Sequence, residues 1–581
     1  MRNKLLEGAY SPYMQMSLVR VWPGVVAVVL QWFFWLALPQ LAPDMTAMGM
    51  IGGILGGGLA VLVWWGFFSR VPMMERLGAL VLMPMVAIAA RPFMDASIQG
   101  GMMGMMFWFM VVPTFCLALV VWAALRQGRV ALVAALLLGS AAWGVMRTDG
   151  VMGEGKAQWA LRWTKNPEQK LLVMEKVEPV VAEKPKVIEA PTPVRMAGSW
   201  PGFRGLNRDD RVTGVRISTD WTASPPKEMW RRSVGPGWSS FAVGDGLIYT
   251  QEQRGEFEVV SCYDLATGKP VWTHKDAARF YESNAGAGPR GTPALHGGWV
   301  YTLGATGVVN ALDAASGRVA WTHDAAKDTG ATLPGWGFSA SPLVVDDLVI
   351  VAASGRMAAY DLATGDLRWK DAVSGGSYSS PHLMTIGGVE QLVMLNIAGA
   401  AGVMPSNGAV LWKHEWAGMP MLQPALTADG GVLVYTNDMA GGMGTRRLAV
   451  VHGEQGWKAD AVWTSNGLKP YFNDIVVQNG HAYGFDGGIL ACIELQEGKR
   501  KWKGGRYGHG QMVLLADQGL LLVLSEEGEL ALVSASPEEF KELGRVRALE
   551  GKTWNHMAVA GEVLLVRNGE EMVAFRVGGR S

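Results

Sequence analysis

The chain has 581 residues, of which 49% are hydrophobic, and its 51 basic residues balance its 51 acidic ones. This balance, and a carboxyl-terminal part without a basic stripe, disfavours a nucleic-acid-binding protein. Long apolar runs are confined to the first 150 positions, which excludes a single uniform domain. We therefore predict a transmembrane domain in residues 1–150, a juxtamembrane segment and Pro/Glu/Lys-rich linker in 151–198, and a repeat domain in 199–581.

The first part of the chain contains five apolar runs. They cover residues 21–41, 48–68, 77–94, 102–125 and 130–146. Each is close to the roughly 20 residues that a helix needs to cross the hydrocarbon core of a bilayer. We predict five α-helical spans surrounded by membrane lipid, which would put the two ends of this domain on opposite sides.

The basic residues of this domain predict its orientation. They gather in the amino-terminal tail and in the second and fourth connections, as Arg2, Lys4, Arg20, Arg70, Arg76, Arg126 and Arg129. The first connection has none, and the third has only Arg91. Because Lys and Arg concentrate on the cytoplasmic side, we predict a cytoplasmic N-terminus and an external carboxyl-terminal part.

The next segment, residues 166–198, is rich in Glu, Lys, Val and Pro. Its prolines are Pro167, Pro179, Pro185, Pro191 and Pro193. Such a composition cannot bury a core, so we predict an extended tether that is semi-rigid where proline is dense.

After the tether, one short sequence recurs. Residues 263–272 read YDLATGKPVW, residues 312–321 read LDAASGRVAW, and residues 360–369 read YDLATGDLRW. Tryptophans recur at intervals of 49, 48, 43, 51 and 39 residues, at Trp272, Trp321, Trp369, Trp412, Trp463 and Trp502. In a β-rich sequence, a period of this length favours a propeller of four-stranded blades.

The repeated residues have physical roles in such a blade. Asp opens a turn by bonding to nearby backbone, and Gly supplies the positive φ that the return strand needs. We expect each Trp to bury its ring against the neighbouring blade and to donate its indole N–H to a backbone acceptor.

The same pattern predicts the number of blades. Residues 511–548 form a further four-strand unit with Val546 in place of the tryptophan, after which only three strands remain. The missing strand is available at residues 228–232, where Trp230 lies 42 positions before Trp272. An early strand that completes the last blade closes the ring and removes exposed edges, so we predict eight blades.

The three cysteines suggest no cofactor attachment. Cys116 lies in the fourth predicted span, and Cys262 and Cys492 occupy third strands five blades apart, so we expect no disulfide. The sequence has no CxxCH motif for covalent haem and no paired CxxC for zinc.

These repeats resemble those of the PQQ-like (pyrroloquinoline quinone-like) eight-bladed propellers, also called the quinoprotein alcohol dehydrogenase-like superfamily. The opening of the domain at residues 200–209, WPGFRGLNRD, is similar to the start of many bacterial members. Five spans followed by an external propeller also resemble the layout of membrane-bound glucose dehydrogenase. The resemblance implies an α-helical transmembrane domain followed by an all-β eight-bladed propeller in the periplasm, anchored in a bacterial inner membrane.

The family includes quinone-dependent alcohol and sugar dehydrogenases as well as a non-enzymatic propeller of outer-membrane protein assembly. The resemblance thus implies either PQQ with Ca²⁺ or no cofactor. The adjacent cysteine pair of some quinone enzymes is absent, and we match no Glu, Asn and Asp set for Ca²⁺. We therefore favour a non-enzymatic scaffold that binds a periplasmic protein partner or a small-molecule ligand. The alternative is a PQQ-dependent dehydrogenase that oxidises a sugar or alcohol and reduces membrane quinone.

Candidate ligand-binding residues lie where the chain leads into the first strand of each blade, at one face of the ring. They are Arg290, Trp336, Tyr378, Asn473, His509 and Trp554. Aromatic and polar side chains suit a planar or sugar-like ligand, and Arg290 could bind a carboxylate of PQQ, which has three. The alternative is structural: the aromatic residues plug the channel, and Arg290 ties loops to Glu282 or to a backbone carbonyl. We assign no catalytic residue and no metal ligand.

Overall fold

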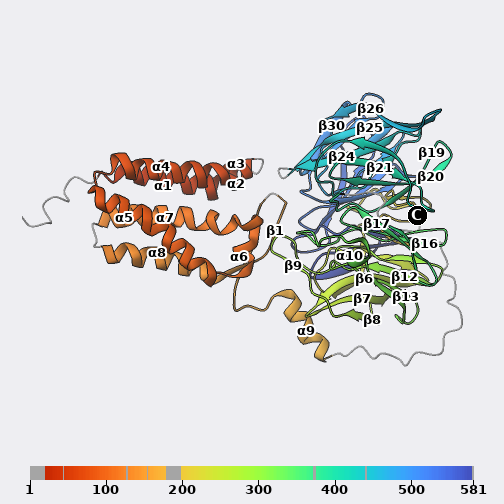
Figure 1. The fold of residues 1–581 in the computed structure, drawn as a ribbon, viewed down its shortest axis with the longest axis horizontal. Coiled ribbons are helices and arrows are strands. Elements are labelled where there is room, and N and C mark those ends of the chain that lie inside the picture. Colours follow the sequence, from red (N-terminus) through yellow and green to blue (C-terminus); the bar gives the residue numbers. More distant parts are fainter. Residues whose placement is uncertain are drawn as a thin grey trace, which may run out of the picture. The chain divides into compact units, whose positions relative to one another are not determined.

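The computed structural model describes residues 20–42, 45–125, 129–153, 155–177, 198–370, 375–438 and 441–578. Arg2, Lys4 and Arg126 and the linker prolines at 179, 185, 191 and 193 lie outside them. The chain forms two compact units, Met1–Thr164 with Glu282–Gly286, and Lys165–Tyr281 with Ala287–Ser581. The first unit is mainly helical and the second is mainly β-sheet (Figure 1).

The helical unit consists of several apolar helices, some with π-helical or 3-10 turns, and one β-hairpin. In chain order these are α1 (Trp22–Trp32), η2 (Phe33–Ala37), α2 (Leu38–Leu41), α3 (Thr46–Ile51), η4 (Gly52–Gly56), α4 (Gly57–Val63), η5 (Trp64–Phe68), α5 (Met73–Ala90), η6 (Arg91–Phe93), α6 (Ala96–Gly100), η7 (Gly101–Gly104), α7 (Met106–Leu125), α8 (Arg129–Gly144), β1 (Met146–Val151) and β2 (Ala157–Leu161). The sequence did not predict the β1–β2 hairpin.

The described residues contain four helices that are long and apolar enough to cross a membrane: Trp22–Leu41, Met48–Phe68, Met73–Phe93 and Met106–Leu125. The prediction of five such helices is wrong in number. The fifth apolar run forms α8, which has only 16 residues and ends at Gly144, because the chain then turns into β1. At 1.5 Å per residue, α8 is about 24 Å long, short of a hydrocarbon core of about 30 Å.

Small residues bring the first two apolar helices close together. A Cβ atom at Gly53 would lie 2.8 Å from the Trp35 backbone nitrogen, and one at Gly57 would lie 2.6 Å from the Gln31 side chain. Glycine is therefore required at both positions, as expected where two membrane helices pack backbone to backbone.

The start of the predicted tether is helical rather than extended. Residues Pro167–Val177 form α9, which belongs to the β-rich unit. Asn166 and Gln169 cap its start by exchanging hydrogen bonds of 3.0 and 2.7 Å between side chains and backbone amides. Glu168 then pairs with Arg279 at 2.8 Å and accepts a 2.8 Å hydrogen bond from the Gly255 amide. The helix forms because a capping signal and this contact with the first blade outweigh the polar composition.

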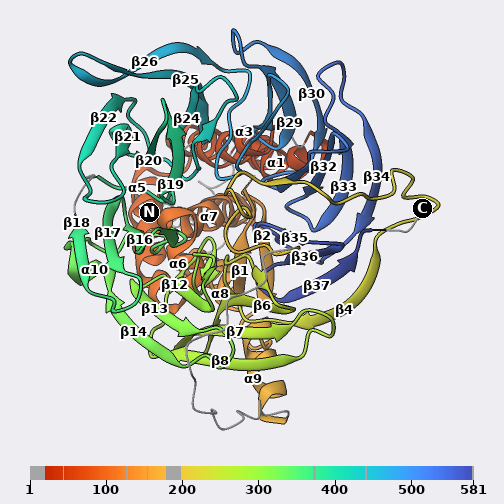
Figure 2. The same ribbon diagram turned by 90° about the vertical axis from the view of Figure 1, so that its right-hand side faces the viewer.

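The second unit is a ring of eight blades, each built on four antiparallel strands and one of them with a fifth strand added, seen face-on in Figure 2. Blades one to four contain β5 (Ala242–Gly244), β6 (Leu247–Arg254), β7 (Phe257–Asp264) and β8 (Pro270–Asp276); β11 (Ala294–His296), β12 (Trp299–Leu303), β13 (Val308–Asp313) and β14 (Val319–Asp324); β15 (Leu343–Val345), β16 (Leu348–Ala353), β17 (Arg356–Asp361) and β18 (Leu367–Lys370); and β19 (His382–Ile386), β20 (Val389–Asn396), β21 (Gly399–Val403) and β22 (Val410–Glu415).

Blades five to eight complete the ring. They contain β23 (Ala425–Leu426), β24 (Val432–Asp438), β25 (Gly441–Gly453) and β26 (Gly456–Ser465); β27 (Val476–Gln478), β28 (His481–Asp486), β29 (Ile489–Glu494) and β30 (Arg500–Arg506); β31 (Gln511–Leu515), β32 (Leu520–Leu524), β33 (Glu529–Ser534) and β34 (Glu542–Arg547); and β35 (Ala558–Ala560), β36 (Val563–Arg567), β37 (Glu571–Arg576) and β4 (Lys227–Ser233). Shorter elements are β3 (Arg211–Val212), β9 (Tyr281–Glu282), β10 (Gly286–Ala287) and α10 (Ala325–Thr329).

The ring closes as the sequence predicted. Strand β4, from the start of the domain, pairs antiparallel with β37 at the end, with Ser233 opposite Glu571. Strand β3 was not predicted: it adds to β31 in parallel as a fifth strand of blade seven.

The repeated tryptophans connect each blade to the next. The indole N–H of Trp272 donates to the Ala314 carbonyl oxygen of blade two at 2.9 Å, and the ring covers Gly317 of the same turn. Trp230, Trp321, Trp369, Trp463 and Trp502 donate to backbone carbonyls of the following blade in the same way. Trp412 differs, because it donates to Gln391 of its own blade. The predicted role is therefore confirmed for six of these seven tryptophans and is wrong for Trp412.

This contact makes the turn glycine necessary for two reasons. Gly317 has a φ of +70°, and a Cβ there would overlap the Trp272 ring, whereas Gly246 has a φ of +77° with nothing within 4 Å. We expect Gly246→Ala to lower the free energy of unfolding by about 1–2 kcal/mol, and Gly317→Ala to lower it by about 1–3 kcal/mol more. Urea unfolding followed by circular dichroism would measure the difference. Equal losses would show that the ring contact contributes nothing.

Candidate functional site

The six candidate residues all lie in the segments that precede the innermost strands of the blades. We call these the rim segments. The structure divides the candidates into two groups: Arg290, Trp336 and Tyr378 precede β11, β15 and β19, and Asn473, His509 and Trp554 precede β27, β31 and β35.

In the first group, the side chain of Arg290 forms hydrogen bonds to backbone carbonyls of the same chain. Its Nε donates to the Trp336 carbonyl oxygen at 3.0 Å, another nitrogen donates to the Gly288 carbonyl, and the guanidinium lies 4.5 Å from the centre of the Phe280 ring. The Trp336 and Tyr378 rings lie 5.0 Å apart. This arrangement matches the structural alternative, in which Arg290 ties loops to a backbone carbonyl.

A buried acid interacts electrostatically with Arg290. Burial raises the pKa of Glu258 from its ordinary 4.5 to about 7, although the charge of Arg290 acts to lower it. Since the folded state holds this proton more tightly than the unfolded chain, stability falls as the pH rises from 4.5 through 7. We expect Glu258→Gln to remove this loss, so that the variant is more stable than the parent at about pH 8 but not at about pH 4. Urea midpoints across this range would test the sign.

The second group forms a closed aromatic cluster. His509 stacks on Phe472 with ring centres 5.1 Å apart, and the Trp554 ring lies 5.0 Å from Phe472. Glu526 accepts a 2.7 Å hydrogen bond from the Trp554 indole, and Lys552 lies over the same ring at 4.5 Å.

Asn473 is fully buried beside this cluster, where its side-chain oxygen accepts the Tyr471 amide at 3.1 Å. The structure therefore brings Trp336 next to Tyr378, and His509 and Trp554 next to Phe472, whereas Asn473 bonds to the Tyr471 backbone.

The centre of the ring is occupied by residues 200–212, which we call the channel segment. It contacts the innermost strands of several blades or the residues directly before them. The Leu295 amide of blade two donates to the Pro201 carbonyl, Arg208 donates to the Pro342 carbonyl before β15, and Arg204 donates to the Ile475 carbonyl before β27. Strand β3 ends this segment. A segment with partners on opposite sides of the ring lies within the central channel.

A buried charge cluster fastens the channel segment. The Arg204 Nε lies 2.5 Å from an Asp210 oxygen and 3.6 Å from an Asp474 oxygen, and His556 lies 3.5 Å from Asp474. Burial raises the pKa of Asp210 to about 6 despite the lowering effect of Arg204, and burial lowers the pKa of His556 to about 4. His556 is therefore neutral near pH 7, and Arg204 carries the charge that both carboxylates face.

The residues present do not fit PQQ with Ca²⁺. The carboxylates of PQQ need free cations, but Arg204 faces Asp210 and Asp474, and Arg208 donates to the Ser341 and Pro342 carbonyls. A flat tricarboxylate in the channel would have to displace the channel segment. No three His, Cys, Asp or Glu side chains gather to hold a metal ion in the described part of the chain.

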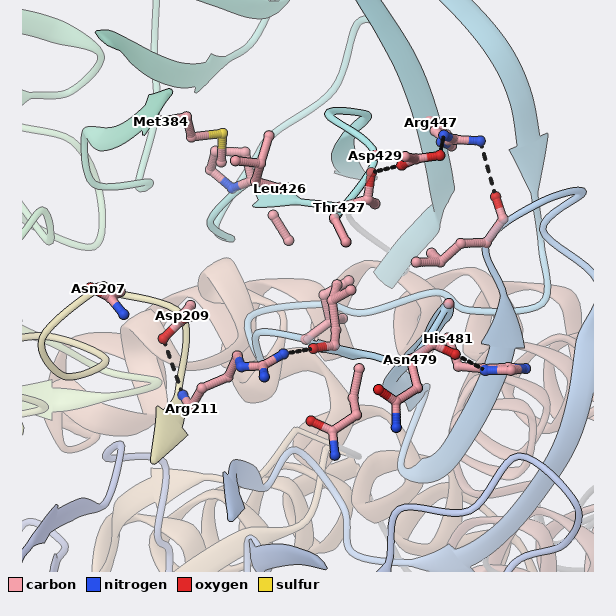
Figure 3. Close-up of a pocket in the computed structure, with 18 of the residues that line it drawn as sticks. Asn207, Asp209, Arg211, Met384, Leu426, Thr427, Asp429, Arg447, Asn479 and His481 are labelled. Atoms are coloured by element: carbon pink, nitrogen blue, oxygen red, sulfur yellow. Dashed lines mark hydrogen bonds and ion pairs between the residues drawn. The ribbon is translucent and has the colours of Figure 1, made fainter. Parts of the chain in front are cut away.

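At the other end of the channel, the structure contains a pocket of about 1120 Å³. It lies between the channel segment and blades four to six, and Figure 3 shows Met384 and Leu426 on one side with Asn207, Asp209 and Arg211 on the other. The turn residues Asp429, Asn479, His481 and Gln496 border it. This pocket lies at the opposite end of the channel from the rim segments. The sequence predicted no binding site at that end.

His382 is the most unusual residue of the pocket wall. It is 5% exposed, and its Nδ1 has no hydrogen-bond partner among the described residues. Burial and then the charges of Arg204 and Arg208 keep its pKa well below the ordinary value, so the ring is neutral. A neutral, unpaired imidazole can either donate to or accept from a bound ligand.

A family model described as outer membrane protein assembly factor BamB matches residues 221–386 and 256–503. Over these residues the propeller is similar to that family. Solved structures similar to it include quinohemoprotein alcohol dehydrogenase ADHIIG from Pseudomonas putida HK5, with 14% identity over 66% of this chain and 81% of that chain and a TM-score of 0.47. The corresponding values for quinohemoprotein alcohol dehydrogenase from Comamonas testosteroni are 14%, 67%, 82% and 0.48.

BamB from Moraxella catarrhalis is similar at 12% identity over 60% of this chain and 99% of that chain, with a TM-score of 0.43. No curated protein matches the chain. At such identities the likeness concerns the propeller fold alone.

Sequence reasoning gave no role to three buried polar residues of the propeller, Arg204, Asp210 and His382. The channel segment was used only for its resemblance, and His382 was not considered. One signal was present: residues 208–211 read RDDR, an unusual charge density before the strand around Trp230. What it could not show is that Arg208 and Asp210 would be buried, with Asp210 close to His556 from the far end of the chain.

Proposed function

We propose that this protein is a membrane-anchored binding scaffold whose PQQ-like propeller presents a surface to a periplasmic protein partner or small-molecule ligand. The proposal depends on one observation. The channel segment fills the channel, and its buried cations Arg204 and Arg208 already bond to carboxylates or carbonyls of the chain. The match to a family model described as an outer membrane protein assembly factor supports the same function. The open pocket at the other end of the channel provides a place for binding.

We further propose that the N-terminus is cytoplasmic and the propeller periplasmic, at a bacterial inner membrane. The four long apolar helices give an even number of crossings, so the labelling below decides directly whether the two ends lie on opposite sides. Arg70, Arg76 and Arg129 lie where cytoplasmic connections would place them.

Cysteine labelling tests this orientation, because the three native cysteines are buried. In intact spheroplasts, an impermeant maleimide should label Lys275→Cys in blade one, and Arg70→Cys only after lysis. The reverse pattern would contradict the proposed orientation.

Cofactor binding discriminates the scaffold from the alternative, a PQQ-dependent dehydrogenase that reduces membrane quinone. Purified protein incubated with PQQ and Ca²⁺ should retain neither tightly and should not reduce a dye with sugars or alcohols. Stoichiometric PQQ that is lost on Arg290→Ala would instead establish the dehydrogenase.

The scaffold itself predicts a partner at the pocket face. A photocrosslinking amino acid at Asn479, which is exposed at the pocket, should capture a specific product in cells. The same probe at Lys275, away from the pocket, should not.

A further inference from the structure

The propeller already contains one extended segment bound to an innermost strand. At β3 and the residue before it, the Asp210 carbonyl accepts a 2.8 Å hydrogen bond from the Leu514 amide, and the Val212 carbonyl accepts a 2.9 Å bond from the Ala516 amide. An innermost strand is an edge of its sheet, with unpaired N–H and C=O groups toward the channel. Blade seven therefore shows that an extended chain can satisfy these groups by strand addition.

Blade four has the matching edge. Strands β19 and β31 each have five residues, whereas the innermost strands of the other blades have two or three. Ile386 and Val389 close a two-residue turn of Gly387 and Gly388, both with positive φ, which makes them a hydrogen-bonded pair. Because antiparallel pairs alternate, the backbone groups of Thr385 and Leu383 point away from β20.

The pocket lies against this edge. Leu383, Met384 and Thr385 of β19 all line it. The innermost strand of the next blade, β23 in blade five, has only two residues and therefore covers less of the channel wall beside them. Asn207 and Asn479 add side-chain amides to the opposite wall, as Figure 3 shows. A slot with a free strand edge, apolar side chains on one wall and amides on the other matches an extended peptide.

His382 lies at the start of β19, on the same pocket wall. Its buried Nδ1 has no partner among the described residues, and an unpaired buried polar atom costs free energy unless a ligand or water satisfies it. Nδ1 is closed to the empty pocket, so the ring would have to turn before a peptide group beside Leu383 could pair with it.

We infer that the pocket binds an extended peptide, which adds as a strand to the channel edge of β19 at Leu383 and Thr385, as β3 adds to β31. This inference rests on the proposed scaffold function and specifies the chemistry of its partner. The bound peptide presents backbone groups to β19 and small or apolar side chains to Met384 and Leu426. The pocket selects an extended backbone more than a particular sequence, because the recognised groups are main-chain N–H and C=O.

The test uses the full-length protein in detergent with a fluorescein-labelled peptide of alternating threonine and valine between two lysines. Its control is the same peptide with alternate backbone nitrogens methylated, which removes the pairing N–H groups. We expect saturable binding of the first peptide only. In hydrogen exchange, the Leu383 and Thr385 amides should exchange more slowly when that peptide is bound.

Proline variants test the edge directly. Thr385→Pro removes an N–H that points to the pocket without breaking the β19–β20 ladder, and it should weaken binding by about tenfold or more. Val344→Pro, at the equivalent position of β15 before the turn closed by Val345 and Leu348, lies outside the pocket and should leave binding unchanged.

The outcomes separate the inference from the scaffold function. Equal binding of the methylated peptide, or equal loss in the two proline variants, would overturn strand addition. Absence of peptide binding while the crosslink at Asn479 persists would overturn the inference but leave the scaffold. Absence of the crosslink with peptide binding intact would overturn the scaffold function.

Discussion

Replacing Arg204 by methionine is expected to lower the free energy of unfolding of the propeller by about 3–5 kcal/mol, because it leaves two buried carboxylates without their cation. Arg204 is 2% exposed, and its guanidinium is shared between Asp210 and Asp474. Although burial acts against the charged form, these carboxylates raise the pKa of Arg204 above its ordinary value. The midpoint of urea unfolding, followed by β-sheet circular dichroism, would measure the loss.

Arg211 provides the matched control in the same segment. It is exposed, and its side chain makes one 2.6 Å hydrogen bond to the Val477 carbonyl. We expect Arg211→Met to cost about 1 kcal/mol or less. If both variants unfolded at the same midpoint, the buried cluster would not be the feature that holds the channel segment in place.

Replacing Trp272 by alanine is expected to cost a similar amount, about 3–5 kcal/mol, because it opens a cavity between blades one and two. The ring is 5% exposed and packs against Gly317 of the following blade, and its indole donates to the Ala314 carbonyl. Trp272→Phe keeps most of the ring but loses the hydrogen bond, so it should fall between the parent and the alanine variant.

The neighbouring Val271 is the control for this prediction. It lies on the same strand and is 38% exposed, so Val271→Ala should cost much less than Trp272→Ala. Thermal unfolding monitored by circular dichroism would compare the three variants. A loss at Val271 as large as that at Trp272 would refute the role of the tryptophan as the contact between blades.

The repeat pattern predicted the number of blades and their closure because its signals are local. In the three clearest copies an Asp, a Gly with positive φ and a Trp recur within about ten residues of each other, and these copies make the same turn. The closure of the ring was predicted by counting strands, because the strand around Trp230 was the one left to complete the last blade. The same local patterns placed Cys262 and Cys492 on third strands and located the apolar helices.

Local patterns failed where the end of a helix depends on the next element of the chain. The run at residues 130–146 is apolar enough to suggest a span, but α8 ends at Gly144, where the chain turns into β1. The predicted tether contained a capping pair, Asn166 and Gln169, whose effect depends on Glu168 reaching Arg279.

By itself the sequence determined the propeller, its eight blades and the positions of the rim segments. Only the tertiary structure decided that the channel segment fills the centre and that the open pocket lies at the opposite end. The physical reason is distance along the chain: Arg204 and Asp210 meet Asp474 and His556 only once the ring has closed. A buried partner for a charged residue, or an unpaired strand edge, depends on contacts between distant residues. Local sequence patterns do not contain these contacts.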